Sequence, residues 1–149
     1  MARSQKEYRR SHSLGSGMGW AFGIALVAVL ASMHMAHADE GDCLARTMWG
    51  EARGEGPSGM VAVADVVMNR AVRDGRTVCA EATAPAQFQG YGRGGVPPAW
   101  VRDLAFRAAS GPDHVRGATH FVRVGTRARW LRRMWRVAVV GHHLFLAPR

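Results

Sequence analysis

The most regular hydrophobic pattern in the chain lies between residues 57 and 74. Apolar residues recur there at intervals of three and four, the spacing that gathers side chains on one face of a helix. The set comprises Met60, Val63, Ala64, Val67 and Met68. Pro57 and Ser58 suit a first helical turn, and Asp74-Gly75 supplies a stop. The pattern therefore predicts a buried core helix, with Asp65, Asn69 and Arg73 elsewhere on the wheel.

Weaker patterns follow toward the C-terminus. A second helix is predicted from Pro98 or Ala99 to Ala109, with Trp100, Leu104 and Ala108 inward. Residues 118–124 alternate and are rich in Thr, Phe and Val, as a strand would be. Residues 137–140 and 144–146 predict a closing strand pair around Gly141. The fold class expected is a mostly helical α+β single domain with a short C-terminal β-hairpin.

The stretch from residue 80 to residue 98 is rich in glycine and proline. That composition opposes regular structure and predicts a surface loop. Its amide and aromatic side chains, Gln87, Phe88, Gln89 and Tyr91, are of the kind that grip sugar rings. Ordinary loop packing is the alternative role for them.

Residues 1–38 have the pattern of an export signal. A basic head ending at Arg9-Arg10 precedes an apolar run over residues 19–31, and small residues at Ala36 and Ala38 fit a cleavage site. A retained membrane anchor over residues 18–35 is the alternative, since that length could just cross a bilayer. The remaining residues 39–149 are enough for one core. We therefore expect an exported domain, in the periplasm or outside the cell, with membrane contact only through its N-terminal segment.

The chain is basic, with a net charge of +9 over 149 residues. Residues 39–149 hold sixteen Arg against ten Asp and Glu, which leaves +6. Nucleic acid, anionic lipid and acidic envelope polymers all suit this charge. Arginines interleave with tryptophans between residues 127 and 136, and the simplest interpretation is an exposed basic face over two core tryptophans. A cleft wall for an acidic glycan fits as well.

Two cysteines, Cys43 and Cys79, lie in the part expected to be exported. An even count in an oxidising compartment predicts one disulfide bridge between them. A nucleophilic thiol would need a partner base, and the spacing is far from the close pairs that structural zinc sites use.

The segment 49–56, Trp-Gly-Glu-Ala-Arg-Gly-Glu-Gly, contains two carboxylates four residues apart. If the backbone is helical there, Glu51 and Glu55 share one face and repel each other. Arg53 or another cation would then neutralise one, while burial near Trp49 raises the pKa of the other. A carboxylic acid that stays protonated near neutral pH can cleave a glycosidic bond. A solvated, charged turn between two helices is the alternative.

Five segments, in order, resemble the SleB-type cell wall hydrolase family. They are residues 43–55, residues 59–70, Thr77-Val78-Cys79, Gln87-Phe88, and the pair 118–121 with 141–145. The resemblance covers roughly residues 43 to 145 and implies a small lysozyme-like, lytic-transglycosylase-like fold that acts on peptidoglycan glycan strands. It implies cleavage between N-acetylmuramic acid and N-acetylglucosamine, with Glu51 at the position of the catalytic glutamate.

The resemblance also implies roles for other residues. His120 and His143 match family positions and are expected to line the cleft or hold the glutamate, while His142 faces away. Glu55, Arg53, Gln87 and Phe88 are expected to support catalysis or bind substrate. Two features depart from the family: Gly50 replaces a larger residue, and the glycine-rich loop 90–95 is shorter and plainer.

Other classes of protein remain open at this point. His120, His142 and His143 with a glutamate could form the metal set of an amidase that cuts the stem peptide, but the ligand spacing of such sites is missing. A non-catalytic envelope glycan-binding protein is the other alternative. We expect a monomeric enzyme that needs no cofactor or metal and binds no nucleic acid.

Overall fold

The computed structural model describes residues 39–149, and the expected export segment, residues 1–38, lies outside the described residues. Its central element is helix α2, Gly56–Asp74. A proline lies in the first turn, where its missing N–H costs nothing. Gly75 ends the helix in the left-handed conformation, with φ of 60°, and the cap amides bond the carbonyls of Ala71 and Val72. The predicted core helix is confirmed.

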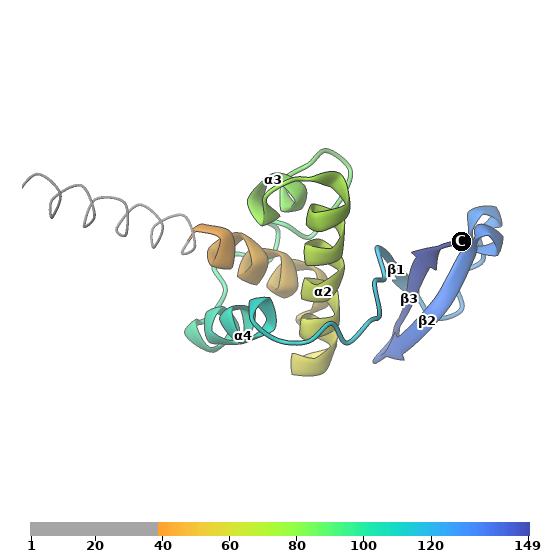
Figure 1. The fold of residues 1–149 in the computed structure, drawn as a ribbon. Helices are drawn as coiled ribbons and strands as arrows, with labels where there is room; N and C mark the ends of the chain where they lie inside the picture. Colours follow the sequence, from red (N-terminus) through yellow and green to blue (C-terminus); the bar gives the residue numbers. More distant parts are fainter. Residues whose placement is uncertain (1–38) are drawn as a thin grey trace, which may run out of the picture. The chain divides into compact units, whose positions relative to one another are not determined.

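Three helices and a sheet pack around α2. A helix over residues 39–52, α3 (Val78–Ala82) and α4 (Ala99–Ala109) lie on one side of α2, and the sheet lies on the other (Figure 1). The shared core is apolar and includes Leu44, Met48, Met60, Val63, Val67, Val101 and Phe145. Because α2 is covered on both sides, its polar residue Asp65 is also buried, 1 % exposed.

The sheet has three antiparallel strands in the order β1-β3-β2. These are β1 (His120–Arg123), β2 (Met134–Val140) and β3 (His143–Pro148), with a 3-10 helix η1 (Arg129–Arg133) before β2. Phe121 pairs with Phe145, and Val140 pairs with His143 beside the hairpin turn. The predicted hairpin and the α+β class are confirmed. The hairpin strands are longer than predicted, since β2 begins three residues earlier and β3 extends from His143 to Pro148.

The predicted position of three tryptophans is wrong. Trp100 is 47 % exposed on α4, where Val101 and Ala105 are buried instead. Trp130 and Trp135 are 43 % and 58 % exposed, so neither belongs to the core. Each tryptophan has partial cover from one neighbour: Trp49 lies beside Trp100, His120 beside Trp130, and the Arg149 guanidinium 4.8 Å from the Trp135 ring centroid.

The glycine- and proline-rich stretch is irregular from residue 83 onward, but α3 occupies its first residues. Thr77 starts α3 by accepting a hydrogen bond from the Ala80 amide at 3.1 Å. The loop is not wholly a surface feature, since Phe88 is 6 % exposed and belongs to the core. Burial of Phe88 ties the loop to the helices.

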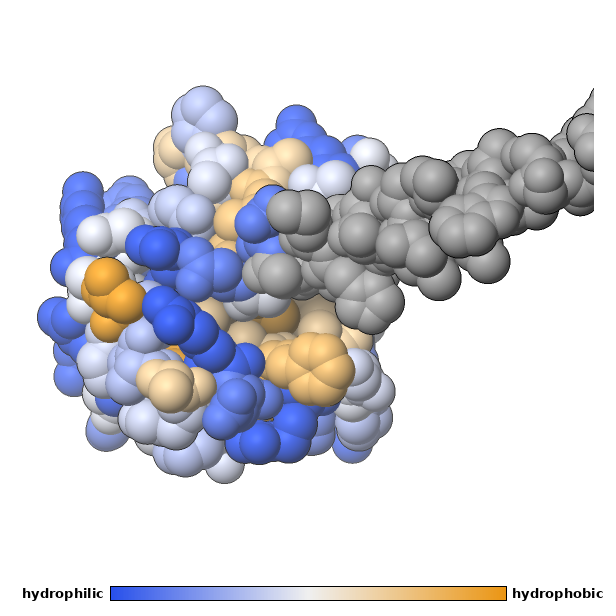
Figure 2. Space-filling view, turned by 90° about the vertical axis from the view of Figure 1, so that its left-hand side faces the viewer, coloured by the Kyte–Doolittle hydropathy of each residue, from blue (hydrophilic) through white to orange (hydrophobic). Residues whose placement is uncertain are grey.

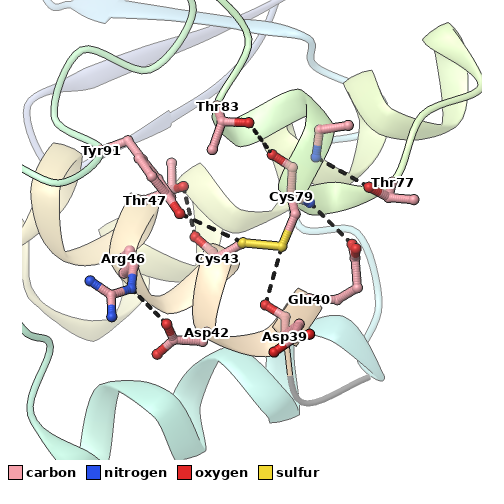
Figure 3. Close-up of a disulfide and its surroundings, with 11 residues drawn as sticks. Asp39, Glu40, Asp42, Cys43, Arg46, Thr47, Thr77, Cys79, Thr83 and Tyr91 are labelled. Atoms are coloured by element: carbon pink, nitrogen blue, oxygen red, sulfur yellow. Dashed lines mark hydrogen bonds and ion pairs between the residues drawn. A yellow bond between two sulfur atoms is a disulfide. The ribbon is translucent and has the colours of Figure 1, made fainter. Parts of the chain in front are cut away.

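The predicted disulfide is present and joins the helix over residues 39–52 to α3 (Figure 3). The Cα atoms of Cys43 and Cys79 are 5.2 Å apart. Figure 3 also shows the Glu40 carboxylate accepting a hydrogen bond from the Cys79 amide at 3.2 Å. The Tyr91 hydroxyl lies 3.7 Å from the Cys43 sulfur. The bridge therefore fixes the helix that leads into Glu51.

The face of the domain drawn in Figure 2 is largely hydrophilic, with hydrophobic side chains scattered among the polar ones. Within residues 39–149, none of the helices is long and apolar enough to cross a membrane.

Candidate active site

Glu51 lies in the last turn of the helix over residues 39–52. Its Oε1 accepts a hydrogen bond from the backbone amide of Gly90 at 2.5 Å. The two backbones are in close contact: a Cβ on Gly50 would overlap the Gly90 carbonyl, and a Cβ on Gly90 would overlap Gly50. Trp49 holds the other end of the loop, since its indole N–H donates to the Gly94 carbonyl at 2.9 Å. The glycine-rich loop thus fixes the orientation of the Glu51 carboxylate.

Glu51 lines a cleft of about 370 Å³. The walls come from five parts of the chain: the first helix, α2, the loop before α4, β1 and η1. The lining residues are Glu51, Val66, Arg70, Ala86, Gln87, Phe88, Gln89, Thr119, His120, Phe121 and Trp130. Of the site residues that the sequence suggests, the structure brings together Glu51, Gln87, Phe88 and His120. Glu51 is the only carboxylate in this lining set.

Arg70 is a cleft residue that the sequence analysis did not identify as one. Its Nε donates to Oε1 of Glu81 at 2.7 Å, and its Nη2 donates to the side-chain oxygen of Gln87. The guanidinium also lies 5.2 Å from the ring centroid of Phe88. The Glu81 side chain is fully buried, and Arg76 contacts its other oxygen at 3.3 Å. The sequence feature that could have pointed to Arg70 is its position at the end of residues 59–70, the second segment that resembles the family.

His120 stands on the cleft wall formed by β1. Its Nδ1 lies 3.0 Å from the Thr119 hydroxyl, and its ring centroid is 5.8 Å from that of Trp130. Burial lowers the pKa of His120, and the positive charges of Arg70 and Arg73 lower it further. The imidazole is therefore neutral at neutral pH, a form that can both donate and accept hydrogen bonds.

Glu55 does not share a helical face with Glu51. The first helix ends at Ala52, and Glu55 is the residue that precedes α2. Its Oε2 accepts a hydrogen bond from the His142 amide at 2.7 Å, and the His142 ring Nδ1 lies 3.2 Å away. The pKa of Glu55 is lowered, chiefly by the His142 amide, then by the His143 and His142 charges. His142 thus lies outside the lining of the Glu51 cleft, and its contact is with Glu55 at the hairpin turn.

Two other expected site residues lie outside the cleft lining. The His143 ring packs against Phe121 and Phe145, with centroid distances of 5.1 and 6.3 Å. Its Nδ1 is buried and has no hydrogen-bond partner within the described part of the chain. Arg53 is exposed in the turn between the first helix and α2. His143 thus supports the cleft wall through Phe121, and Arg53 has no described contact with the cleft.

The residues that could ligate a metal are dispersed. Across residues 39–149, no three His, Cys, Asp or Glu side chains lie together in a group that could hold a metal ion. His120 faces the cleft, whereas His142 contacts Glu55 at the hairpin turn.

A cleft with one carboxylate among aromatic, amide and imidazole side chains can supply an acid–base group and hydrogen bonds to a polar substrate. Comparison with known proteins identifies the class of enzyme. Residues 54–146 match the family model described as Cell Wall Hydrolase, and the chain belongs to this family. No curated protein sequence matches the chain significantly.

Two solved structures share the fold. The chain resembles the catalytic domain of the Bacillus cereus SleB protein, with a TM-score of 0.65 and 25% identity over 72% of this chain and 89% of that one. It also resembles the catalytic domain of the germination-specific lytic transglycosylase SleB from Bacillus anthracis, with a TM-score of 0.64 and 24% identity over 72% of this chain and 93% of that one. These similarities confirm the expected lysozyme-like fold class. The protein is a cell wall hydrolase of peptidoglycan.

Proposed function

We propose that this hydrolase cleaves the bond between N-acetylmuramic acid and N-acetylglucosamine as a lytic transglycosylase, with Glu51 as general acid and base. The observation that supports this is the single carboxylate in the lining of the Glu51 cleft. Glycosidases that use water generally need a second carboxylate about 5 to 9.5 Å away. Glu55 is engaged by His142 at the hairpin turn, so it is a poor candidate for that second group.

The hydrogen bonding of Glu51 suits both halves of such a reaction. Within the described residues, Gly90 is the hydrogen-bond partner of Oε1, which leaves Oε2 for the substrate. Protonated Glu51 donates its proton to the leaving glycosidic oxygen. The resulting carboxylate then takes the proton of the muramic C6 hydroxyl, whose oxygen attacks C1 and closes an anhydro ring. One carboxylate is sufficient for both proton transfers.

The other lining residues bind and orient the sugar. Phe88 and Trp130 offer apolar ring surface, while Gln87 and neutral His120 offer hydrogen bonds to hydroxyl and acetamido groups. Arg70 fixes Gln87 and contacts Phe88, so it positions two of these groups. Glu55 and His143 support the walls, and Arg53 at most assists from outside the cleft.

The location of the substrate bears on residues 1–38. Peptidoglycan lies outside the cytoplasm, so a leader or anchor over those residues would deliver residues 39–149 as the catalytic domain. The domain acts there as a monomer that needs no metal or other cofactor.

The test is mass spectrometry of the fragments that the detergent-solubilised full-length chain releases from purified peptidoglycan. Wild type is compared with Glu51→Gln, and with Asp103→Asn as a control for the loss of one carboxylate. Asp103 is exposed on α4, outside the cleft lining. We expect anhydro-muropeptides from wild type and Asp103→Asn and none from Glu51→Gln.

Other products would overturn the proposal in distinct ways. Reducing sugar ends would indicate hydrolysis by two carboxylates, and free stem peptides would indicate an amidase. Full activity of Glu51→Gln would remove Glu51 from the reaction. Binding to the wall without any release would indicate a glycan-binding protein.

A further inference from the structure

The basic charge of the domain is concentrated in its C-terminal third. Residues 114–149 contain eight Arg and neither Asp nor Glu, whereas residues 39–113 contain eight Arg and ten Asp and Glu. The positive part includes all three strands and η1. An anionic group is therefore attracted to the sheet end of the domain and not to the helical end.

A second pocket lies within this basic part. It has a volume of about 560 Å³ and is lined by Thr126, Arg127, Ala128, Arg129, Leu131, Arg132 and Arg136. We call it the arginine pocket. All four of its arginines are exposed, and none forms an ion pair with a carboxylate of residues 39–149. Four unpaired guanidinium groups around one cavity repel each other and bind carboxylate or phosphate oxygens well.

The arginine pocket adjoins the Glu51 cleft through η1. Arg129 and Leu131 line the arginine pocket, while Trp130, between them in sequence, lines the cleft with Glu51. One turn of 3-10 helix thus contributes to both sites. A ligand that occupies the cleft can reach the arginine pocket if it carries a flexible anionic branch.

We infer that the arginine pocket binds the carboxylates of the stem peptide on the same glycan strand whose sugars occupy the Glu51 cleft. This inference rests on the proposed function. A stem peptide is joined to muramic acid, the sugar that would lie at Glu51, and four extended residues span roughly 13 Å. Anionic lipids and nucleic acids offer negative charge without the glycan, so the adjacency of the two sites favours the peptide.

The test measures binding and uses the full-length Glu51→Gln chain, so that strands are not cut. Three soluble glycan strands serve as probes: strands with stem peptides, strands with the peptides removed, and strands whose peptide carboxylates have been amidated. Arg132→Gln/Arg136→Gln removes two pocket arginines. Arg102→Gln/Arg107→Gln is the matched control, because these arginines are exposed on α4 outside both pockets.

We expect the pocket variant to bind peptide-bearing strands about tenfold or more weakly, the loss typical of hydrogen bonds to charged groups. Its binding to peptide-free strands should match that of the parent chain, and the control should match on both probes. Amidation of the peptide carboxylates should weaken strand binding by the parent chain by a similar factor. This comparison does not depend on the pocket variant. Thermal melting checks that both double variants remain folded.

Several outcomes overturn the inference. These are unchanged binding of the pocket variant to peptide-bearing strands, an equal loss on peptide-free strands, and an equal loss in the control. The parent chain and the pocket variant are also tested on vesicles of anionic phospholipid, and a loss confined to these vesicles would assign the pocket to the membrane instead. The proposed function fails separately: chains with native Glu51 would then release no anhydro-muropeptides, whatever the binding data show.

Discussion

Gly50 and Gly90 contact each other backbone to backbone, and this contact places the Gly90 amide on the Glu51 carboxylate. Gly50 and the short glycine-rich loop 90–95 are the two features that we expected, from the sequence, to depart from the family pattern. In the structure the two features depend on each other, because the loop can approach the helix this closely only where both segments lack a Cβ. A larger residue at position 50 would need a different path for the loop.

Gly50→Ala should therefore destabilise the domain and reduce cutting of peptidoglycan. The added methyl group would overlap the Gly90 carbonyl, and overpacking of this kind costs about 1–3 kcal/mol. Thermal melting and muropeptide release measure the two effects. Gly54→Ala is the control, since a Cβ there meets nothing within 4 Å. Identical behaviour of the two variants would show that the Gly50–Gly90 contact is not needed.

Glu81→Gln should lower the free energy of unfolding by about 3–5 kcal/mol. Glu81 is fully buried and holds Arg70 and Arg76, so its loss leaves the partly buried Arg70 charge without its partner. Chemical denaturation measures the change. Activity should fall too, because Arg70 orients Gln87 and Phe88 in the cleft.

Asp74→Asn is the matched control for this prediction. It also removes one carboxylate partner of an arginine on α2, but the Arg73–Asp74 pair is largely solvated, with side chains 41 % and 28 % exposed. Exposed pairs contribute about 0–1 kcal/mol. If the two variants lose similar amounts of stability, the prediction that the buried Glu81 pair contributes more than the exposed Asp74 pair is wrong.

Glu55 should give the domain an acid-sensitive contribution to stability. Its pKa is lowered in the folded chain, chiefly by the His142 amide, so folding favours the ionised form. The contribution is complete above the ordinary glutamate pKa of about 4.3 and is lost as the pH falls through the lowered folded value. Melting temperatures between pH 3 and pH 7 should fall less steeply toward acid for Glu55→Gln than for wild type.

The exposed Asp103→Asn variant is the control for this pH series and should keep the wild-type slope. A wild-type slope for Glu55→Gln would exclude the His142 contact in solution. Glu55→Gln should also keep part of its cutting activity, because Glu55 lies outside the cleft lining.

Replacing both Cys43 and Cys79 with serine should destabilise the domain by about 4 kcal/mol in the chain-entropy model. The bridge spans a sequence separation of 36 and joins the first helix to α3. The melting temperature should fall by more than about 10 °C. Reductant should lower the melting temperature of wild type in the same way and leave that of the double variant unchanged. Two free thiols in the purified wild-type chain would contradict the bridge.

Parts of the fold could be predicted because their causes are local. The apolar period and the Gly75 stop specify α2, and the same local signals specify α4 and the hairpin around Gly141. The tryptophans were misplaced because period alone does not say which apolar residues a neighbouring element covers. The helical spacing of apolar residues in α4 predicted that Trp100 faces inward, yet Val101 and Ala105 face the core.

The sequence by itself determined the α+β class, the disulfide pair and the position of Glu51 as the candidate catalytic acid. Only the tertiary structure decided which residues surround that acid. Arg70 and Trp130 line the cleft because the folded chain places α2 and η1 around Glu51. Glu55 lies outside the cleft lining, where it binds His142, a residue 87 positions away in the sequence. Residue type and spacing record what each segment can form, whereas proximity between segments depends on how the whole core packs.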